Sequence, residues 1–376
     1  MTNAITQLKE QAEKNFAELE LPSFNYGNGF ALNLTMEWEK IFTGIERAED
    51  AEIIADQRVR ICKLSDLGEN FISKHAQKLI LASENKLLAL HYAVASETTV
   101  IIIPKNTVLE NPIIIESKAS SISAESIMIV AEEGAQAMIV EKAEKTASSL
   151  NSYYHSRIIQ IYLKPKAKMT YCTMHNEKTG THAFTSKRAE VEQDAEMKWF
   201  DLVIGEGFTQ VQLRSNLQGV GAAAEQYQVI IGTESQLSDI KSDTFHQHSN
   251  TKSLMLAKGI LSDKARAMYR GTVRVEKNAK NCQGHQRSDL LLMGEEAHGN
   301  AIPILEVEND EVSCSHATSM GQIDEEQLYY LLSRGLDEKE AKKILVLGFI
   351  EPLLQKITHE KSREEILNII QLKLEK

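Results

Sequence analysis

Two side chains that could bind a soft metal stand one residue apart near the end of the chain. Cys314 and His316 lie in the run Glu-Val-Ser-Cys-Ser-His that begins at Glu311. On a β-strand, residues i and i+2 point to the same face, so the thiol and the imidazole would stand side by side. Thiolate and imidazole bind borderline metals and iron–sulfur clusters. Taken alone, the spacing favours an ordinary strand end with a packed thiol. Whether the pair binds a metal has to be judged from the surrounding sequence.

Other cysteines and histidines form weaker pairs. His246 and His248 would share a strand face, where two polar side chains on a solvated surface are the favoured interpretation. Cys282 and His285 stand in a polar run that predicts a loop and an incidental pair. The four cysteines form no Cys-x-x-Cys unit, which argues against a disulfide framework and a structural zinc site. Three further residues are expected to be structural, namely Cys62 and Cys172 as buried side chains and His298 in a turn.

Composition excludes several classes of function. The 376 residues are 42% hydrophobic and 25% charged, and 42 basic against 53 acidic side chains give a net charge of −11. No basic stripe occurs, which argues against a nucleic-acid ligand. The N-terminal sequence is polar and unlike a signal peptide, and no run of about eighteen apolar residues could span a membrane. We therefore expect a cytoplasmic protein.

Motifs for nucleotide hydrolysis are also missing from the sequence. No Walker A pattern, no Gly-x-Gly-x-x-Gly and no Gly-x-Ser-x-Gly elbow occurs. If the protein depends on ATP, a partner must supply its hydrolysis. Nucleotide hydrolysis and hydrolase chemistry are therefore not encoded in recognisable form.

The chain divides into three regions that differ in predicted secondary structure. Residues 1–95 are predicted to be mainly helix and loop, 96–322 to be a succession of short strands, and 323–376 to be helical. A regular rhythm of strands over more than two hundred residues favours a β-solenoid over a sandwich or barrel. The runs that carry this prediction are 98–103, 112–116, 126–130, 136–140, 157–163, 197–203 and 226–231.

The C-terminal region has clear sequence signals for the starts and ends of helices. A capping residue followed three positions later by Glu or Gln marks a helix start, and glycine marks a helix end. These signals predict starts at Asp324 with Gln327, at Asp337 with Glu340 and at Ser362 with Glu365, and a stop at Gly335.

Several segments in order resemble the core of the SufB/SufD family of iron–sulfur cluster assembly proteins. The likeness is close over residues 251–350 and looser over the strands before it. It rests on the segments 251–261, 265–271, 290–294, 303–307, 314–316 and 327–335.

The resemblance implies a mainly β fold, a right-handed parallel β-helix flanked by helical N- and C-terminal regions. In that family, SufB and SufD pair through their β-helices, and each binds the ATPase SufC through its C-terminal helical domain. The chain has no Walker motif, which agrees with ATP hydrolysis by a separate subunit. The resemblance therefore implies a protein that is not an enzyme by itself. By this resemblance, the residues expected to bind the ATPase are Gln327, Leu328, Tyr329, Arg334 and Gly335.

Two departures favour a SufD-type over a SufB-type member. SufB proteins resemble this chain but carry a cysteine where it has Ser288, and a glutamate where it has Ala317. The Cys-Ser-His order is similar to SufD, which implies that Cys314 and His316 face a SufB-type partner. His316 would then be a metal ligand for a nascent, transient iron–sulfur cluster shared with SufB, and Cys314 a helper. No permanently bound cofactor is expected.

Two alternatives stay open at this point. One is a SufB-like scaffold that holds a cluster alone, and the other is a carbohydrate-active β-helix enzyme. The acidic residues are scattered along the sequence, whereas such enzymes cluster carboxylates in a groove. A homodimer of the isolated chain is also plausible, because a β-helix edge can pair with a second copy.

Overall fold

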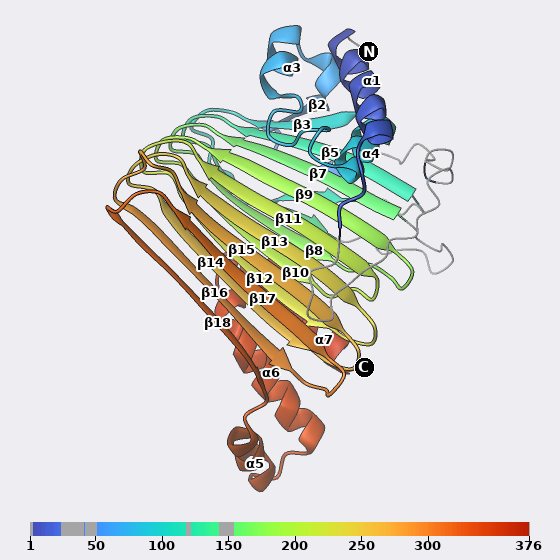
Figure 1. Cartoon of the computed structure of the whole chain (residues 1–376), viewed down its shortest axis with the longest axis vertical. Coiled ribbons are helices and arrows are strands. Elements are labelled where there is room, and N and C mark those ends of the chain that lie inside the picture. The colour runs from blue at the N-terminus through green and yellow to red at the C-terminus, as the bar shows by residue number, and fades with distance from the viewer. Residues whose placement is uncertain (1–2, 24–40, 42–50, 118–121, 143–153, 376) are drawn as a thin grey trace.

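The computed structural model describes residues 3–23, 41, 51–117, 122–142 and 154–375. Its centre is a β-solenoid made of two sheets that face each other, each with nine strands (Figure 1). From β3 onward, successive strands alternate between the sheets, so strands two apart in sequence become parallel neighbours. The first two strands instead pair antiparallel, β1 with β4 and β2 with β3. This confirms the mainly β solenoid with helices at both ends of the chain.

The strands follow the order expected of a solenoid. The first sheet comprises β1 (Glu52–Ile54), β4 (Ile113–Glu116), β6 (Gln136–Lys142), β8 (Lys168–His175), β10 (Glu196–Val203), β12 (Ala223–Gly232), β14 (Lys252–Leu261), β16 (Cys282–Leu292) and β18 (Val312–Gln322). The second sheet comprises β2 (Arg60–Lys63), β3 (Thr98–Ile103), β5 (Ile122–Ala131), β7 (Tyr154–Leu163), β9 (His182–Val191), β11 (Phe208–Leu217), β13 (Leu237–His246), β15 (Arg266–Val275) and β17 (His298–Val307). All seven predicted runs lie on strands.

Side chains of one kind stack from coil to coil inside the solenoid. Ile101, Ile129, Ile161 and Ala189 are partners in register on successive strands of the second sheet, and all are buried. Such a stack is favourable because each buried aliphatic side chain contributes roughly 1.5–3 kcal/mol. On the outside, ion pairs join the same positions of neighbouring coils, as between Lys164 and Glu192, 28 residues apart. The interior stack and the exterior ladder both hold successive coils in register.

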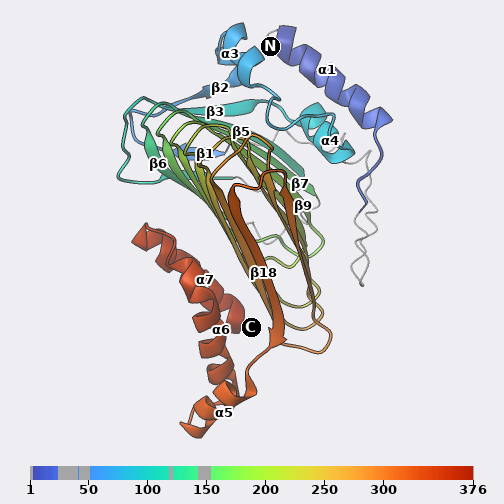
Figure 2. The ribbon, with the colours of Figure 1, turned by 60° about the vertical axis from the view of Figure 1, so that its left-hand side comes forward.

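The N-terminal helices cover the outer face of the second sheet. They are α1 (Asn3–Glu18), η1 (Leu64–Asp66), α3 (Glu69–His75) and α4 (Lys86–Val94), and they pack on β3, β5 and β7 (Figure 2). The imidazole of His91 reaches between two of these strands, with hydrogen bonds to Ser126 (2.8 Å) and Ser156 (2.7 Å). The short strands β1 and β2 also lie in this part of the chain, which was predicted to be mainly helix and loop.

Three helices follow β18, and two of them cover the outer face of the first sheet. They are α5 (Glu325–Ser333), α6 (Glu338–Leu354) and α7 (Glu360–Glu375), and α6 and α7 pack against the outward-facing apolar side chains of β10, β12 and β14. The caps Asp324 and Asp337 accept backbone N–H groups as predicted, and Gly335 ends α5 with φ +92°. The predicted cap Ser362 is wrong, because α7 begins at Glu360. The Nδ1 atom of His359 accepts the backbone N–H of Ser362 instead.

Candidate functional site

Cys314 and His316 lie on β18, the last strand of the first sheet. Their register partners on β16 are Gly284 and Gln286, which are buried, whereas the intervening His285 is exposed. Cys314 and His316 therefore face the inside of the solenoid, as the i, i+2 spacing predicts. Among the described residues no further coil follows β17 and β18, so this inner face lies at an open end.

The two side chains differ in exposure. Cys314 is half-buried and packs beside Met255, Val273 and Cys282, and burial raises the pKa of its thiol even though the N–H of Gly284 lowers it. His316, two residues further along the same face, is exposed. The imidazole is thus available to an incoming ion without rearrangement, whereas the thiol must lose a proton and part of its packing.

A second imidazole and a second thiol stand behind Cys314. A Cβ placed on Gly284 would lie 3.4 Å from both Cys314 Sγ and His246 Nε2. The ring nitrogens of His246 are hydrogen-bonded to Thr251 Oγ1 (2.7 Å) and Ser253 Oγ (2.8 Å). Cys282 Sγ also contacts Thr251 Oγ1, at 3.1 Å. Both groups are buried and fully bonded, so they support the site from behind instead of opening onto it.

These positions correct three of the sequence interpretations. His246 is fully buried, not on a solvated face, and His248 lies beyond the end of β13. Cys282 and His285 belong to strand β16 and point to opposite faces, so they form neither a loop nor a pair. His298 is the first residue of β17 and not part of a turn. The coils on either side bury His246 and Cys282 but not His248, His285 or His298, and local sequence cannot reveal which are covered.

The remaining cysteines behave as predicted. Cys172 is buried, and Cys62 is half-buried against the cluster beneath the N-terminal helices. Burial raises the pKa of the Cys172 thiol to about 12. Neither is near β18.

The other two positions singled out in the sequence, Ser288 on β16 and Ala317 on β18, both lie just past the level of His316 along these strands. Ser288 is buried on the inner face of β16, where its hydroxyl donates to Thr318 Oγ1 (3.2 Å). Ala317 is on the opposite, outer face of β18. A cysteine at position 288 would therefore join the same inner face as His316, but a serine adds no soft ligand there.

The ligand set at the open end is incomplete. Within residues 3–23, 41, 51–117, 122–142 and 154–375, no group of three His, Cys, Asp or Glu side chains could hold a metal ion. Iron in proteins and in clusters takes more ligands than Cys314 and His316 can offer. Any ion or cluster bound there would need further ligands from a second molecule or from sulfide.

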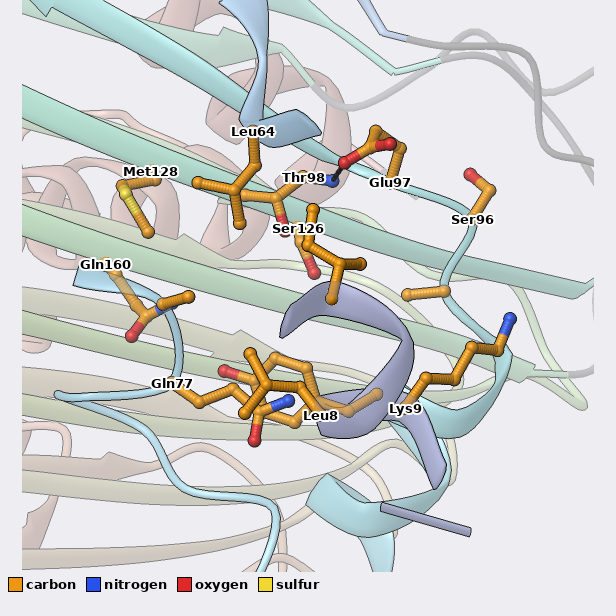
Figure 3. Close-up of a pocket in the computed structure, with 14 residues that line it drawn as sticks. Leu8, Lys9, Leu64, Gln77, Ser96, Glu97, Thr98, Ser126, Met128 and Gln160 are labelled. Carbon is orange, nitrogen blue, oxygen red and sulfur yellow. Dashed lines mark hydrogen bonds between the residues drawn. The ribbon is translucent and has the colours of Figure 1, made fainter. Parts of the chain in front are cut away.

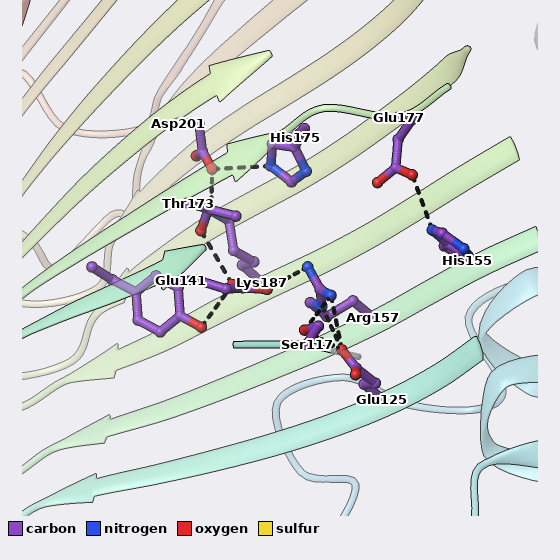
Figure 4. A network of polar contacts seen from close by, with 11 residues as sticks. Ser117, Glu125, Glu141, His155, Arg157, Thr173, His175, Glu177, Lys187 and Asp201 are labelled. Carbon is purple, nitrogen blue, oxygen red and sulfur yellow. Dashed lines mark hydrogen bonds and ion pairs between the residues drawn. The ribbon is translucent and has the colours of Figure 1, made fainter. Parts of the chain in front are cut away.

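Sequence reasoning missed a buried polar network further inside the solenoid (Figure 4). Lys187 is fully buried, forms an ion pair with Asp201 and donates to Thr173 Oγ1 (3.2 Å). Asp201 also accepts from His175, at 3.3 Å. Arg157 on β7 pairs in the same interior with the half-buried Glu125 of β5 and with the buried Glu141 of β6 in the facing sheet. In the sequence these residues look like the polar half of half-exposed strands, so no local signal marks them.

The open end exposes apolar side chains on both terminal strands. Ile302, Ile304 and Val307 of β17 and Met320 of β18 are 37–50% exposed. Each of these strands is the last of its sheet, so its outer backbone N–H and C=O groups have no strand partner among the described residues. Apolar side chains along an unpaired edge form a surface that favours association.

The helix α5 projects away from the solenoid (Figures 1 and 2). Tyr329 is 74% exposed and Tyr330 55% exposed, while Leu328 is half-buried. Gln327 and Arg334 are also exposed, and the Arg334 guanidinium lies 5.0 Å from the centroid of the Tyr330 ring. These aromatic side chains form an uncovered surface on a short capped helix.

Two pockets in the described part of the chain offer no better candidate site than the open end of the solenoid. One lies under α1 and α4, lined by Leu8, Gln77 and Ser126 among others, and its volume of about 60 Å³ suits a few water molecules (Figure 3). A larger one of about 470 Å³ is open and lined by exposed ion pairs such as Lys168 with Glu196. In the part of the chain that the structure describes, no helix is both long enough and apolar enough to cross a membrane.

Comparison with known proteins identifies the family. The family model described as "SUF system FeS cluster assembly, SufBD core domain" matches residues 113–349. The chain therefore belongs to the SufBD family. That range includes most of the solenoid strands, the Cys314–His316 pair, α5 and most of α6.

Curated relatives agree with that assignment. Proteins of Staphylococcus saprophyticus and Staphylococcus epidermidis, each named an iron–sulfur cluster assembly SufBD family protein, are 28% identical over 361 residues. A protein of the same name from Staphylococcus aureus is 28% identical over 359 residues. In each case the match covers 94% of this chain and 76% of the relative. The predicted SufB/SufD family is confirmed, and these names do not separate its two branches.

Proposed function

We propose that this chain is a SufD-type subunit of a cytoplasmic iron–sulfur assembly complex, without enzymatic activity of its own. It would pair with a SufB-type subunit and bind a SufC-type ATPase. The observation that carries the proposal is the placement of Cys314 and His316 on the inner face of the open last coil. An exposed imidazole beside a half-buried thiol is half of a ligand set, presented where a second solenoid could stack.

In this proposal the cluster is cargo assembled between two chains. The SufB-type partner would supply thiolate, and His316 would complete the coordination across the interface. A neutral imidazole adds less negative charge than a thiolate, so the shared cluster is held less tightly. Because the ligands come from two molecules, a displacement of one against the other opens the site and releases the cluster.

The terminal surface supports pairing with another solenoid. The exposed side chains of Ile302, Ile304, Val307 and Met320 would be buried by a partner. The unpaired edges of β17 and β18 could extend their sheets into those of the partner by backbone hydrogen bonding. The same surface could join two copies of this chain when no SufB-type subunit is present.

The exposed face of α5 supports ATPase binding. Tyr329 and Tyr330 are large aromatic side chains with much of their surface uncovered, and such residues often dominate the binding energy of interfaces. Gln327, Leu328, Arg334 and Gly335 lie on the same helix and at its C-terminal stop. ATP-driven movement of the partner would then act on the solenoid through α5 and α6.

Iron and acid-labile sulfide in the co-expressed complex test this function. The complex with the SufB-type and SufC-type partners is purified with wild-type chain, with His316→Ala and with the control His285→Ala. His285 is also exposed and lies one strand away, but it faces the outside. We expect His316→Ala to lose most of the iron and sulfide while the complex stays assembled, and His285→Ala to retain both.

Equal iron content in all three complexes would make this subunit a structural platform only. The alternative of a SufB-like scaffold that holds a cluster alone is tested by reconstituting the isolated chain with iron and sulfide. We expect no stable cluster, because Ser288 offers no thiolate beside His316. A stable cluster on the isolated chain would favour the SufB-like role.

A further inference from the structure

Lys258 makes a contact that joins the C-terminal helices to the solenoid. It projects from the outer face of β14, where its ammonium donates a hydrogen bond to the backbone carbonyl of Phe349 in α6. The same Nζ atom lies 4.5 Å from the centroid of the Phe349 ring. One lysine thus binds both the backbone and the side chain of a single helical residue.

The contact falls where α6 is weakest as a helix. Pro352 lies inside α6 and has no N–H, so the carbonyl of Gly348 loses its usual donor four residues on. Gly348 is itself a poor helix former. The hydrogen-bond ladder of α6 is therefore interrupted at Gly348, and Lys258 donates from the solenoid to the next carbonyl, that of Phe349.

Lys258 also stands at one end of a polar row that crosses the outer face of the sheet to β18. It acts on that row through its charge, without a hydrogen bond or ion pair to it among the described residues. Its register partner on β16 is Asp289, whose partner on β18 is Ser319. The Ser319 hydroxyl donates to Asp289 Oδ1 at 2.6 Å, and Arg287 Nε donates to Asp289 Oδ2 at 2.9 Å. Burial lowers the pKa of Lys258, and the charge of Asp289 acts in the opposite direction. The row ends on the strand that carries His316 on its other face.

We infer that Lys258 is a positioning residue that clamps the interrupted turn of α6 and links its position to β18 through Asp289 and Ser319. The turn lies between two anchored parts of α6, with Val346 buried before it and Ile350, Leu353 and Leu354 buried after it. A partner that pulls on α5 would therefore load α6 across the turn that Lys258 holds. The consequence for cluster handling rests on the proposed function. The clamp and its link to β18 are properties of the chain alone.

Hydrogen–deuterium exchange of the isolated full-length chain tests the inference. Lys258→Met keeps the length of the side chain but removes its charge and its donor. We expect roughly ten-fold faster exchange at residues 348–356 and also in β18, as for the loss of a hydrogen bond from a charged donor. Lys258→Arg keeps a donor and should remain close to wild type.

Two controls keep the result specific. Lys198→Met removes a half-exposed lysine from the outer face of β10 in the same sheet, where it pairs with Glu225, and should leave both segments unchanged. Ser319→Ala, at the far end of the row, should accelerate exchange at residues 348–356 as well as in β18. That reciprocal effect is what a link between the two segments requires.

Three results would overturn the inference. Unchanged exchange in Lys258→Met would remove the clamp, and acceleration in α6 without any in β18 would remove the link. Uniform acceleration across the solenoid would make Lys258 a general stability residue. The experiment needs no partner and no iron, so it can fail while His316 proves essential, and it can succeed while the proposed function fails.

Discussion

The middle coils of the solenoid and its last coil place similar residues on the same inner face, with opposite consequences. In the middle, Lys187 and Asp201 are fully enclosed and form an ion pair with each other. At the end, His316 has the same inward orientation and is exposed, because no described coil follows β18. The difference lies in the number of neighbouring coils and not in the type of side chain.

The comparison separates residues that hold the fold from residues that can meet a partner. Burial alone would raise the pKa of the Asp201 carboxyl, but the Lys187 ammonium and the His175 imidazole lower it below its usual value. A charge kept in that way is costly to disturb. A polar group at the open end has lost little hydration, so it is free to exchange water for a ligand.

The largest effect is expected from breaking the buried ion pair. Lys187→Met leaves Asp201 as an uncompensated buried charge, which costs about 3–5 kcal/mol of unfolding free energy. Urea unfolding measures it, with Lys168→Met as the control, because the exposed pair of Lys168 with Glu196 contributes at most about 1 kcal/mol. Adding Asp201→Leu to Lys187→Met should restore much of the loss. Equal effects of Lys187→Met and Lys168→Met would erase the distinction between enclosed and exposed charges.

A second effect is the pH dependence of stability, compared for His246 in an enclosed coil and His316 in the last coil. Burial lowers the pKa of His246 from an ordinary value of 6.5 to about 4. The unfolded chain takes up a proton below about pH 6.5 and the folded chain does not until about pH 4, so stability falls as the pH drops through that window. The loss is about 1.4 kcal/mol per pH unit, or roughly 3 kcal/mol in all.

Unfolding free energy measured between pH 7 and pH 4 tests this, comparing His246→Gln with His316→Gln. His246→Gln should flatten the pH dependence over that range, whatever its effect at pH 7. His316→Gln is the control variant, because it changes an exposed histidine that also faces the inside of the solenoid. Part of the slope will survive in both, because burial also lowers the pKa of His91 to about 3. Identical slopes in wild type and His246→Gln would contradict the assignment.

The sequence predicted the solenoid where strands carry Val and Ile, and missed it where inner positions are polar or glycine. Strand β16, with Gly284 and Gln286 facing inward, resembles a loop in sequence. Its burial comes from β14 and β18 on either side, about thirty residues away in each direction. The repeat was also hidden at the corners, where Lys166 and Glu234 adopt positive φ values that usually require glycine.

For the site, sequence established the shared face of Cys314 and His316 but not their exposure. The i, i+2 spacing fixes the face once a strand is accepted. Whether that face is covered depends on the absence of another coil, which local spacing does not encode. The same reason explains why Lys187 and Asp201 were not singled out. Their pairing needs two sheets to close over each other.

The smallest expected change in unfolding free energy is that of Met320→Ala, which is compared with a substitution of its register partner Leu290. Leu290 on β16 is buried, and its partner Met320 on β18 is 50% exposed. Leu290→Ala should lower the unfolding free energy by about 2–5 kcal/mol, as for a cavity in a packed core. Met320→Ala should change it by about 0.5 kcal/mol or less, because solvent already covers much of that side chain.

For pairing with a SufB-type partner, we expect position 320 to matter more than position 290. Met320→Glu places a charge on the surface proposed to meet a SufB-type partner, so we expect it to weaken pairing at least ten-fold by analytical ultracentrifugation, as at an interface hot spot. The chain itself should stay folded, with unfolding free energy near that of the wild type. If Met320→Glu instead unfolds the chain as Leu290→Ala would, the last coil belongs to the packed core. The distinction between enclosed and open coils would then have to be drawn elsewhere.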